Sequence, residues 1–456
     1  MRQAALFAIS VATLWPAKAL AHASDQSFVL LLPTGAYTAA GVTAVVLTVA
    51  ALFLVPERWT RTAFAHRSLA DRNAPRTTMI TSLASFIVLA ALVALGFAGP
   101  RSPLENLLPL TFWTLGWVAL VSLCAVMGNL WTWLNPWTGL YQLIGPDWRQ
   151  RPIPQGWGQW PALVLLIGFT AFLLADIAPD DPARLAGFVA IYWCVTMAGY
   201  LLCGPSWMAQ VELGHAICGA YGRLAAFQPS SPGGVGGPGW HLIARHSQTA
   251  AGFFALSLLA AGSFDGLNET FWWLGTIGVN PLEFPGRSAV ILPTLLGLLA
   301  TIALLFATFA ATVWLGLRFA KENAAFTPIF GKLALSLLPI AFVYHVAHYL
   351  PSFLVSIQYA TAALSDPLGT GADLLGIQPF NVTTGFFNRL DTVRFIWLSQ
   401  AGLVVLGHVW SVLLAHRIAL DLFAPRRAAI ATLPLSIFMI AYTFLGLWLL
   451  AAPRGA

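Results

Sequence analysis

Long apolar blocks are the feature of this sequence that most restricts its fold. Ten segments approach the roughly 20 residues that a helix needs to cross a bilayer. Charged residues are only 9% of the 456, too few to cover a soluble domain, in which about 25% are charged. We predict an all-α polytopic membrane protein with about ten transmembrane helices. The predicted spans are 33–56, 78–99, 107–128, 160–178, 185–206, 249–266, 288–316, 333–362, 393–416 and 431–452.

The first 21 residues have the pattern of a secretory signal peptide. Arg2 precedes an apolar run that ends in small residues. The small-x-small rule fits cleavage after Ala21, which exposes His22, or after Ala23. An N-terminal His22 would offer an amine and an imidazole to copper, but the residue can equally be a mere flank of the cut. The mature chain, 22–456, is predicted to be one ten-helix domain.

The basic residues predict the orientation. Of the 23 Arg and Lys residues, fifteen fall in loops on one side of the ten-span pattern and six on the other, and two lie in the signal peptide. By the positive-inside rule, the protein lies in a bacterial inner membrane with both mature termini in the periplasm. The lipid bilayer is thus the expected partner. No basic tract is interleaved with exposed aromatics, so we expect no nucleic-acid binding.

Two loops on the basic side carry their own predictions. The connection 129–160 holds six tryptophans and should lie along the membrane interface, which tryptophan prefers. In the connection 207–248, the glycines of 229–238 have neither a preceding strand nor a following Lys-Ser/Thr, so they indicate a flexible linker and no phosphate loop. Glu212 and His215 share a helical face there and are further site candidates.

Histidines inside predicted spans are the strongest functional signal, because an ionisable group in a bilayer is costly. His345 and His348 lie three apart on one helical face, His408 lies in the next span and His416 closes it. Imidazoles at similar depth could hold a divalent transition metal (copper, zinc or iron) or ligate haem. Alternatively, each histidine bonds a carbonyl or a tyrosine and holds helices together.

The loop after the eighth span adds two carboxylates, Asp366 and Asp373. Both stand beside Pro or Gly, where aspartate is ordinary turn chemistry, although both could also serve a metal near the outer mouth. The sequence has no Gly-x-Ser-x-Gly or HExxH motif. If the protein hydrolyses a substrate, metal-activated water is therefore the more plausible nucleophile.

Several short motifs resemble those of the bacterial polytopic membrane proteins called fenitrothion hydrolases. The matching pieces are Ala21-His22-Ala23, Asn135-Pro136-Trp137, Ala347-His348-Tyr349, Gln358 with Ser365-Asp366-Pro367-Leu368-Gly369, and Gly407-His408 with Leu414-Ala415-His416. The resemblance implies hydrolysis of an organophosphate triester, a small hydrophobic substrate, without assigning catalytic residues. His345 and Arg417 depart from the family pattern.

Three functions remain open from the sequence. The first is a metal-dependent phosphotriester hydrolase within the membrane. The second is a metal-ion or solute transporter that uses the same histidines. The third is a haem- or copper-binding membrane redox protein. The sequence does not choose among them, because all three use imidazoles inside a helical bundle.

Overall fold

The computed structural model describes residues 29–454, except for 53, 55–56, 70–74, 230–232, 245–248 and 284–285. The predicted signal peptide and His22 lie outside the described residues. Within the described part almost every element is a helix, and the prediction of an all-α membrane protein is confirmed.

By length and composition, nine helices among the described residues can cross a membrane. A shorter apolar helix, α10 (Trp160–Ala175), coincides with the fourth predicted span, so an apolar helix underlies each of the ten. The nine are α3 (Thr34–Leu52), α5 (Pro75–Ala98), the continuous α6 (Leu107–Pro109), η1 (Leu110–Leu120) and α7 (Val121–Met127), α11 (Pro182–Cys203), α15 (Thr249–Asn268), α17 (Arg287–Ala320), the continuous α18 (Phe326–Ala334), η4 (Leu335–Leu337) and α19 (Leu338–Ser365), α20 (Leu390–Leu422) and α21 (Pro425–Ala451).

Shorter elements connect these helices. They are α4 (Glu57–Ala63), β1 (His66–Ser68), α8 (Trp131–Leu134), α9 (Thr138–Ile144), η2 (Gln155–Trp157), α12 (Pro205–Gln210), α13 (Leu213–Gly222), β2 (Phe227–Gln228), β3 (Gly234–Gly236), α14 (Trp240–Ala244), α16 (Phe271–Thr276), η3 (Pro281–Glu283) and η5 (Gly385–Asn388).

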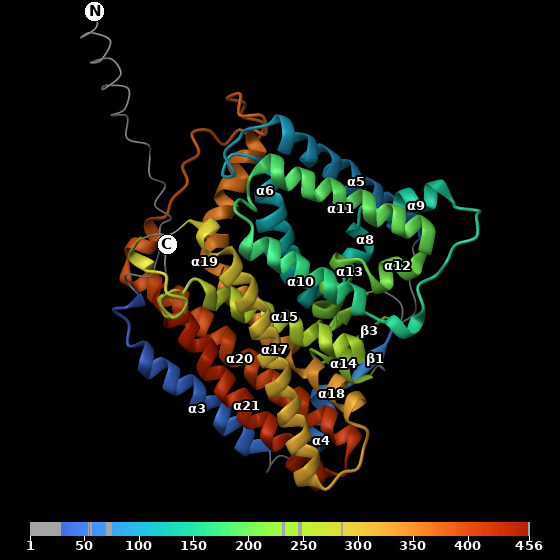
Figure 1. Ribbon diagram of the computed structural model, residues 1–456, viewed down its shortest axis with the longest axis vertical. Coiled ribbons are helices and arrows are strands. Elements are labelled where there is room, and N and C mark those ends of the chain that lie inside the picture. Colours follow the sequence, from blue (N-terminus) through green and yellow to red (C-terminus); the bar gives the residue numbers. More distant parts are fainter. Residues whose placement is uncertain are drawn as a thin grey trace, which may run out of the picture.

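The long helices form two groups that meet along α19 and α15 (Figure 1). One group holds α3, α17, α20 and α21, and the other holds α5, α11 and the α6–η1–α7 helix. α19 packs against both α20 and η1, while α10 packs against α15 and α17. The two central helices therefore carry the contacts through which the groups can influence each other.

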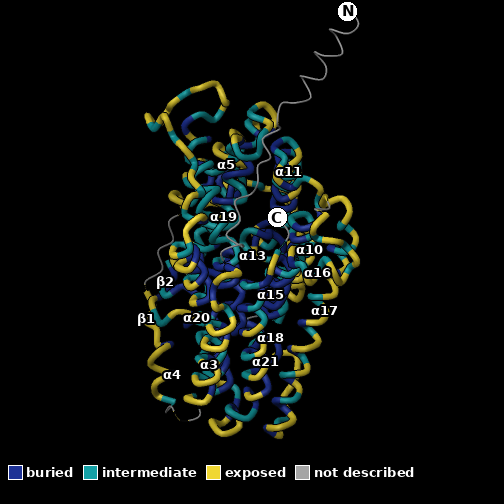
Figure 2. The backbone as a smooth tube through the Cα atoms, turned by 90° about the vertical axis from the view of Figure 1, so that its left-hand side faces the viewer, coloured by how far each residue is buried: buried dark blue, intermediate teal, exposed yellow. Residues whose placement is uncertain are grey.

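Burial separates the central helices from the peripheral ones (Figure 2). In the apolar window of α15, 78% of the residues are buried inside the protein, against 11% in α3 and 17% in α5. Peripheral helices expose large apolar side chains, such as Leu304 and Ile191. A bilayer accepts such surfaces because helices satisfy their own backbone hydrogen bonds. Ionisable groups on α15 and on the buried part of α19 are thus shielded from lipid.

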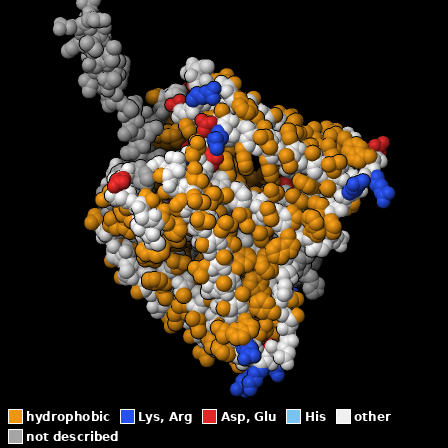
Figure 3. Space-filling model, in the orientation of Figure 1, with side chains coloured by type: hydrophobic (Ala, Val, Ile, Leu, Met, Phe, Trp, Pro, Cys, Tyr) orange, Lys and Arg blue, Asp and Glu red, His pale blue; other side chains and the backbone are white. Residues whose placement is uncertain are grey.

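On the face shown in Figure 3, charged side chains gather at the upper left, at the right-hand edge and at the bottom tip, and the surface between them is mostly apolar. We call the end with Arg318, Lys321, Arg426 and Arg427 the basic end. The opposite end, where α15 and α21 finish and Arg454 lies, is called the C-terminal end. Such an apolar surface is what a bilayer requires.

The described part of the glycine-rich segment, residues 233–238, contains a β-strand. β3 lies between β1 and β2 in a small antiparallel sheet, with His66 opposite Gly236 and Phe227 opposite Val235. A Cβ at Gly237 would lie 1.7 Å from the carbonyl oxygen of Ala63. The glycines therefore serve close backbone approach, which corrects the prediction of a flexible linker.

The tryptophan-rich connection also differs in part from its prediction. Trp148 and Trp157 are exposed, as an interfacial segment would have them. Trp137, however, is 3% exposed, and its Nε1 donates to the carbonyl of Trp193. Because α8 and α9 pack against α5, this half of the connection belongs to the core.

Candidate functional site

A carboxylate, an imidazole and a phenol meet where α15 and α19 pack together. His348 Nε2 lies 3.3 Å from Asp265 Oδ2, and the hydroxyl of Tyr349 donates to the same oxygen at 2.5 Å. Asp265 stands one turn before the end of α15, whereas His348 stands in the middle of the α19 helix. The cluster therefore lies towards the C-terminal end of α15 and is crossed by α19.

The side chains of Asp265 and His348 are largely buried. The side chains of His348 and Asp265 are 9% and 12% exposed. Glu269, in the turn that follows α15, is exposed and lies within range of the charges of Asp265, His348 and Arg454. The C-terminal segment closes over this end, where Thr270 and Arg454 form an antiparallel bridge. The pair therefore lies beneath the C-terminal segment, with a small part of each side chain exposed.

One nitrogen of His348 has no partner. Nδ1 is buried without a hydrogen bond, while Nε2 faces the carboxylate. The ring of Tyr344, one turn back along α19, lies almost parallel to that of His348, with centroids 6.1 Å apart. The Tyr344 hydroxyl is also buried without a partner. A buried polar atom without a bond is costly and calls for a reason.

His345 has a different partner. Its Nε2 lies 3.0 Å from the carbonyl oxygen of Trp117, which can only accept, so this nitrogen must carry a proton. Trp117 belongs to η1, an eleven-residue π-helix, a form often found at functional sites. The indole and imidazole rings also meet edge to face, 4.9 Å apart. His345 therefore joins the two helix groups.

His408 is buried on α20, 1% exposed. Its Nδ1 lies 2.8 Å from the carbonyl oxygen of Val404 and must be the donor, which leaves a lone pair on Nε2. That Nε2 is buried and unpartnered. The ring lies 6.4 Å from that of Tyr442 on α21, not against His348. Gln400, two turns before His408 on α20, donates to the carbonyl of Ala347, the residue before His348.

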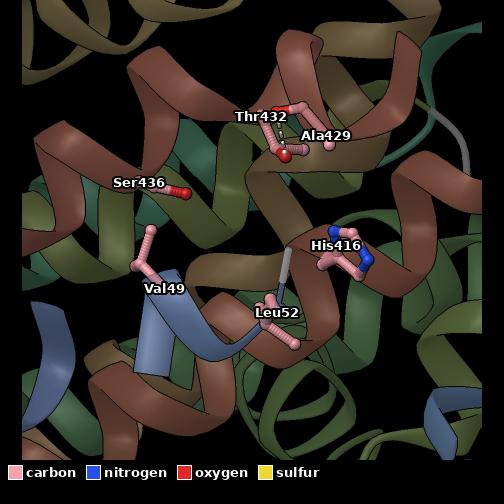
Figure 4. Close-up of a pocket in the computed structure, with 6 residues that line it drawn as sticks. All are labelled: Val49, Leu52, His416, Ala429, Thr432 and Ser436. Atoms are coloured by element: carbon pink, nitrogen blue, oxygen red, sulfur yellow. Dashed lines mark hydrogen bonds between the residues drawn. The ribbon is translucent and has the colours of Figure 1, made fainter. Parts of the chain in front are cut away.

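His416 is separate from these groups. It lines a small cleft formed by Val49 and Leu52 of α3 and by Ala429, Thr432 and Ser436 of α21 (Figure 4). His416 comes eight residues after His408, towards the basic end of α20. The structure thus gives this histidine surroundings of its own.

Glu212 has a structural role. It caps α13 by accepting from the backbone nitrogens of Gly214 and His215, and it also accepts from Trp131 Nε1 and the Tyr192 hydroxyl. Burial raises the pKa of Glu212, although these four donors oppose the shift. His215 contributes its backbone to the cap, while burial lowers the pKa of its side chain. Because four donors already bind its carboxylate, Glu212 serves as a helix cap.

Asp366 and Asp373 organise their loop. Asp366 accepts from the backbone nitrogens of Thr370 and Gly371, and Asp373 accepts from those of Ile377 and Gln378 and from the Ser365 hydroxyl. These donors hold the pKa of both carboxyls below the ordinary range. The turn chemistry that the sequence allowed is what the contacts show.

The four membrane histidines do not form one first coordination sphere. Among the described residues, no group of three or more His, Cys, Asp or Glu side chains could hold a metal ion. A metal or haem shared by His345, His348 and His408 thus stays a prediction without support from the geometry. Sequence reasoning missed Asp265 as the partner of His348, although an acid inside the predicted span 249–266 was the available signal.

Comparison with known proteins identifies no relative of this chain. No family model, no curated protein and no solved structure matches the chain. The resemblance to fenitrothion hydrolases rests on the short motifs alone.

Proposed function

We propose that the protein is a proton-coupled transporter of a divalent transition-metal cation such as Zn²⁺ or Mn²⁺. The observation that supports it is the Asp265–His348 pair, a carboxylate and an imidazole 3.3 Å apart whose side chains are only 12% and 9% exposed. A carboxylate and an imidazole compete for protons and for cations, since both ligate a metal only when deprotonated. Cation entry would therefore displace a proton, which couples the two movements.

The donor set suits such a cation. Asp265 supplies a carboxylate and His348 an imidazole nitrogen 3.3 Å away, and oxygen and imidazole ligands suit manganese and zinc. A cation in transit keeps part of its water shell, so it needs fewer protein ligands than a resident cofactor. The short list of nearby donors fits passage better than permanent storage.

The surrounding helices offer a way to transmit the change. Protonation or cation binding changes the charge at the α15–α19 contact, and α19 also packs against η1 in the other helix group. Pro351, three residues after His348, lies inside α19, and η1 is a π-helix. Both are common places for a helix to bend. The pair thus sits beside elements able to take two arrangements.

Proteoliposomes test the transporter directly. Vesicles would hold a pH-sensitive dye or a zinc-sensitive dye, and Zn²⁺ or Mn²⁺ would be added outside. We expect metal ions to enter the vesicles while protons move out. The rate of both movements should fall at least tenfold in Asp265→Asn and in His348→Gln. Asp391→Asn, an exposed acid in the first turn of α20, is the matched control and should keep the wild-type rate. Equal rates in empty vesicles and in vesicles with protein would reject the transporter.

Phosphotriester hydrolysis is the second candidate. His348 has one nitrogen on a carboxylate and the other free, the arrangement that orients imidazoles on catalytic metals. Such a site would use a metal-bound water, and the motif resemblance points to the same chemistry. Release of nitrophenol from a chromogenic phosphotriester, dependent on added Zn²⁺ and lost in His348→Gln, would support it. Metal uptake without nitrophenol release would favour transport.

A further inference from the structure

Several buried polar groups continue from the Asp265–His348 pair towards His408. We propose that they form a proton path from His348 through Tyr344, Ser263 and Tyr442 to His408. The inference rests on the proposed function and adds the route by which the proton crosses the bundle core.

The first step follows one face of α19. Tyr344 lies one turn from His348 and its ring stacks with the imidazole. Its hydroxyl lies against Gly266 of α15, where an added Cβ would come within 2.0 Å of the phenol oxygen. Only a glycine at this position leaves room for the hydroxyl. The phenol is thus directed at α15 immediately beside Asp265.

The second step crosses α15. Ser263 lies three residues before Gly266, so both residues belong to one helical face. The Ser263 hydroxyl donates to the carbonyl of Leu259 at 2.7 Å and lies 2.5 Å from the Tyr442 hydroxyl. Because Ser263 has one proton, Tyr442 is the donor in that contact. The lone pairs of the Tyr442 oxygen remain available to a further donor.

The third step reaches His408. The Tyr442 ring lies 6.4 Å from the imidazole, and His408 Nε2 carries a buried lone pair without a partner. Three buried polar atoms along this route therefore lack a hydrogen bond: His348 Nδ1, the Tyr344 oxygen and His408 Nε2. Ordered water, which typically bonds unsatisfied buried polar groups, would complete the path.

The proton transfers balance without any other reactant. Protonated His348 releases a proton from Nδ1. Each hydroxyl or water on the path accepts one proton on a lone pair and gives up another. His408 Nε2 takes the last one, while Nδ1 keeps its bond to Val404. The groups that face His348 are Asp265, Glu269, Arg454, His345, Tyr344 and Tyr349, and Tyr442 faces His408.

The direct test is hydrogen–deuterium exchange at the His408 ring, followed by NMR on ring-¹⁵N-histidine protein in lipid nanodiscs. Wild-type protein should show the Nδ1–H tautomer of His408 and exchange with solvent. The double variant Ser263→Ala/Tyr442→Phe should slow that exchange at least tenfold. Ser399→Ala/Tyr359→Phe, which removes hydroxyls from α20 and α19 away from the path, is the matched control and should exchange as the wild type does.

The proteoliposome assay gives a second readout. Ser263→Ala/Tyr442→Phe and His408→Gln should each lower proton movement per metal ion at least fivefold while metal still binds at Asp265–His348. A His408 ring with a proton on Nε2 in wild type, or equal exchange in the path and control variants, would overturn the path. If wild-type vesicles move no metal but the exchange result stands, the transporter proposal fails and the path survives.

Discussion

Trp131 donates a 2.8 Å hydrogen bond from its indole nitrogen to Glu212 Oε2, although 81 positions separate them in the chain. This bond ties the short helix α8 to the first turn of α13. The backbone nitrogens of Gly214 and His215 and the Tyr192 hydroxyl complete the shell around the carboxylate. Glu212 is 1% exposed, so each donor would lose a buried acceptor if the carboxylate were removed.

Glu212→Ala should therefore destabilise the fold. Leaving buried donors unpaired and removing a helix cap should lower the free energy of unfolding by about 2–4 kcal/mol. Glu212→Gln keeps an acceptor oxygen and should lose about half as much. Thermal unfolding in detergent, followed by tryptophan fluorescence, measures the change. Glu105→Ala, an exposed acid, should leave the midpoint unchanged. An unchanged midpoint of thermal unfolding in Glu212→Ala would show that the cap does not stabilise the fold.

The loop after α19 should loosen only in acid. The pKa values of Asp366 and Asp373 are lowered by bonds from backbone nitrogens. A group with a lowered pKa contributes stability above its ordinary value, near 3.9, and loses it as the pH falls through the lowered one. Backbone hydrogen exchange at Gly371 and Ile377, corrected for intrinsic rates, should therefore accelerate only below pH about 4. Asp366→Asn should accelerate exchange at Gly371 at neutral pH and leave Ile377 protected.

Gly266→Ala should disturb the cluster between α15 and α19. The added methyl would collide with the Tyr344 hydroxyl, which must move. We expect a loss of about 1–3 kcal/mol, the usual cost of overpacking, together with slower exchange at the His408 ring. Gly187→Ala on α11 meets nothing within 4 Å and should be neutral or slightly stabilising, since alanine favours helix. Equal stability of the two variants would contradict the close packing.

Single cysteines test the orientation. Thr370 is exposed in the loop after α19 and Thr62 is exposed on the short helix α4, so each can be replaced and labelled. Thr60 is unsuitable because it is 4% exposed. A membrane-impermeant thiol reagent added to intact cells should label Thr370→Cys, and Thr62→Cys only after the membrane is opened. Labelling in the reverse order would invert the proposed orientation, and labelling of both in intact cells would contradict the ten-span pattern.

The sequence predicts the helices of this protein well because each span carries its own signal. Hydrophobic length is local, and all ten predicted spans coincide with an apolar helix. Partners are not local. The prediction that His348 would face His408 assumed that consecutive helices pair at equal depth, whereas His348 contacts Asp265, 83 positions away on α15. The position of Trp131 depends in the same way on its hydrogen bond to Glu212, and no spacing rule predicts that partner.

The small sheet beside α14 (Figure 1) has a consequence for how the chain is made. β1 precedes α5, but its partner β3 is synthesised only after α5 to α13 have emerged. The backbone of His66 and Arg67 therefore has no strand partner while the group of α5, α11 and the α6–η1–α7 helix enters the membrane. When β3 arrives, its glycines allow the backbone contact with Ala63 and Ala65, and Trp240 can stack on His66. The sheet thus forms late and fixes the segment of α3 and α4 to the rest of the protein. Substitutions at Gly237 should therefore trap an insertion intermediate in which α3 and α4 are not yet packed.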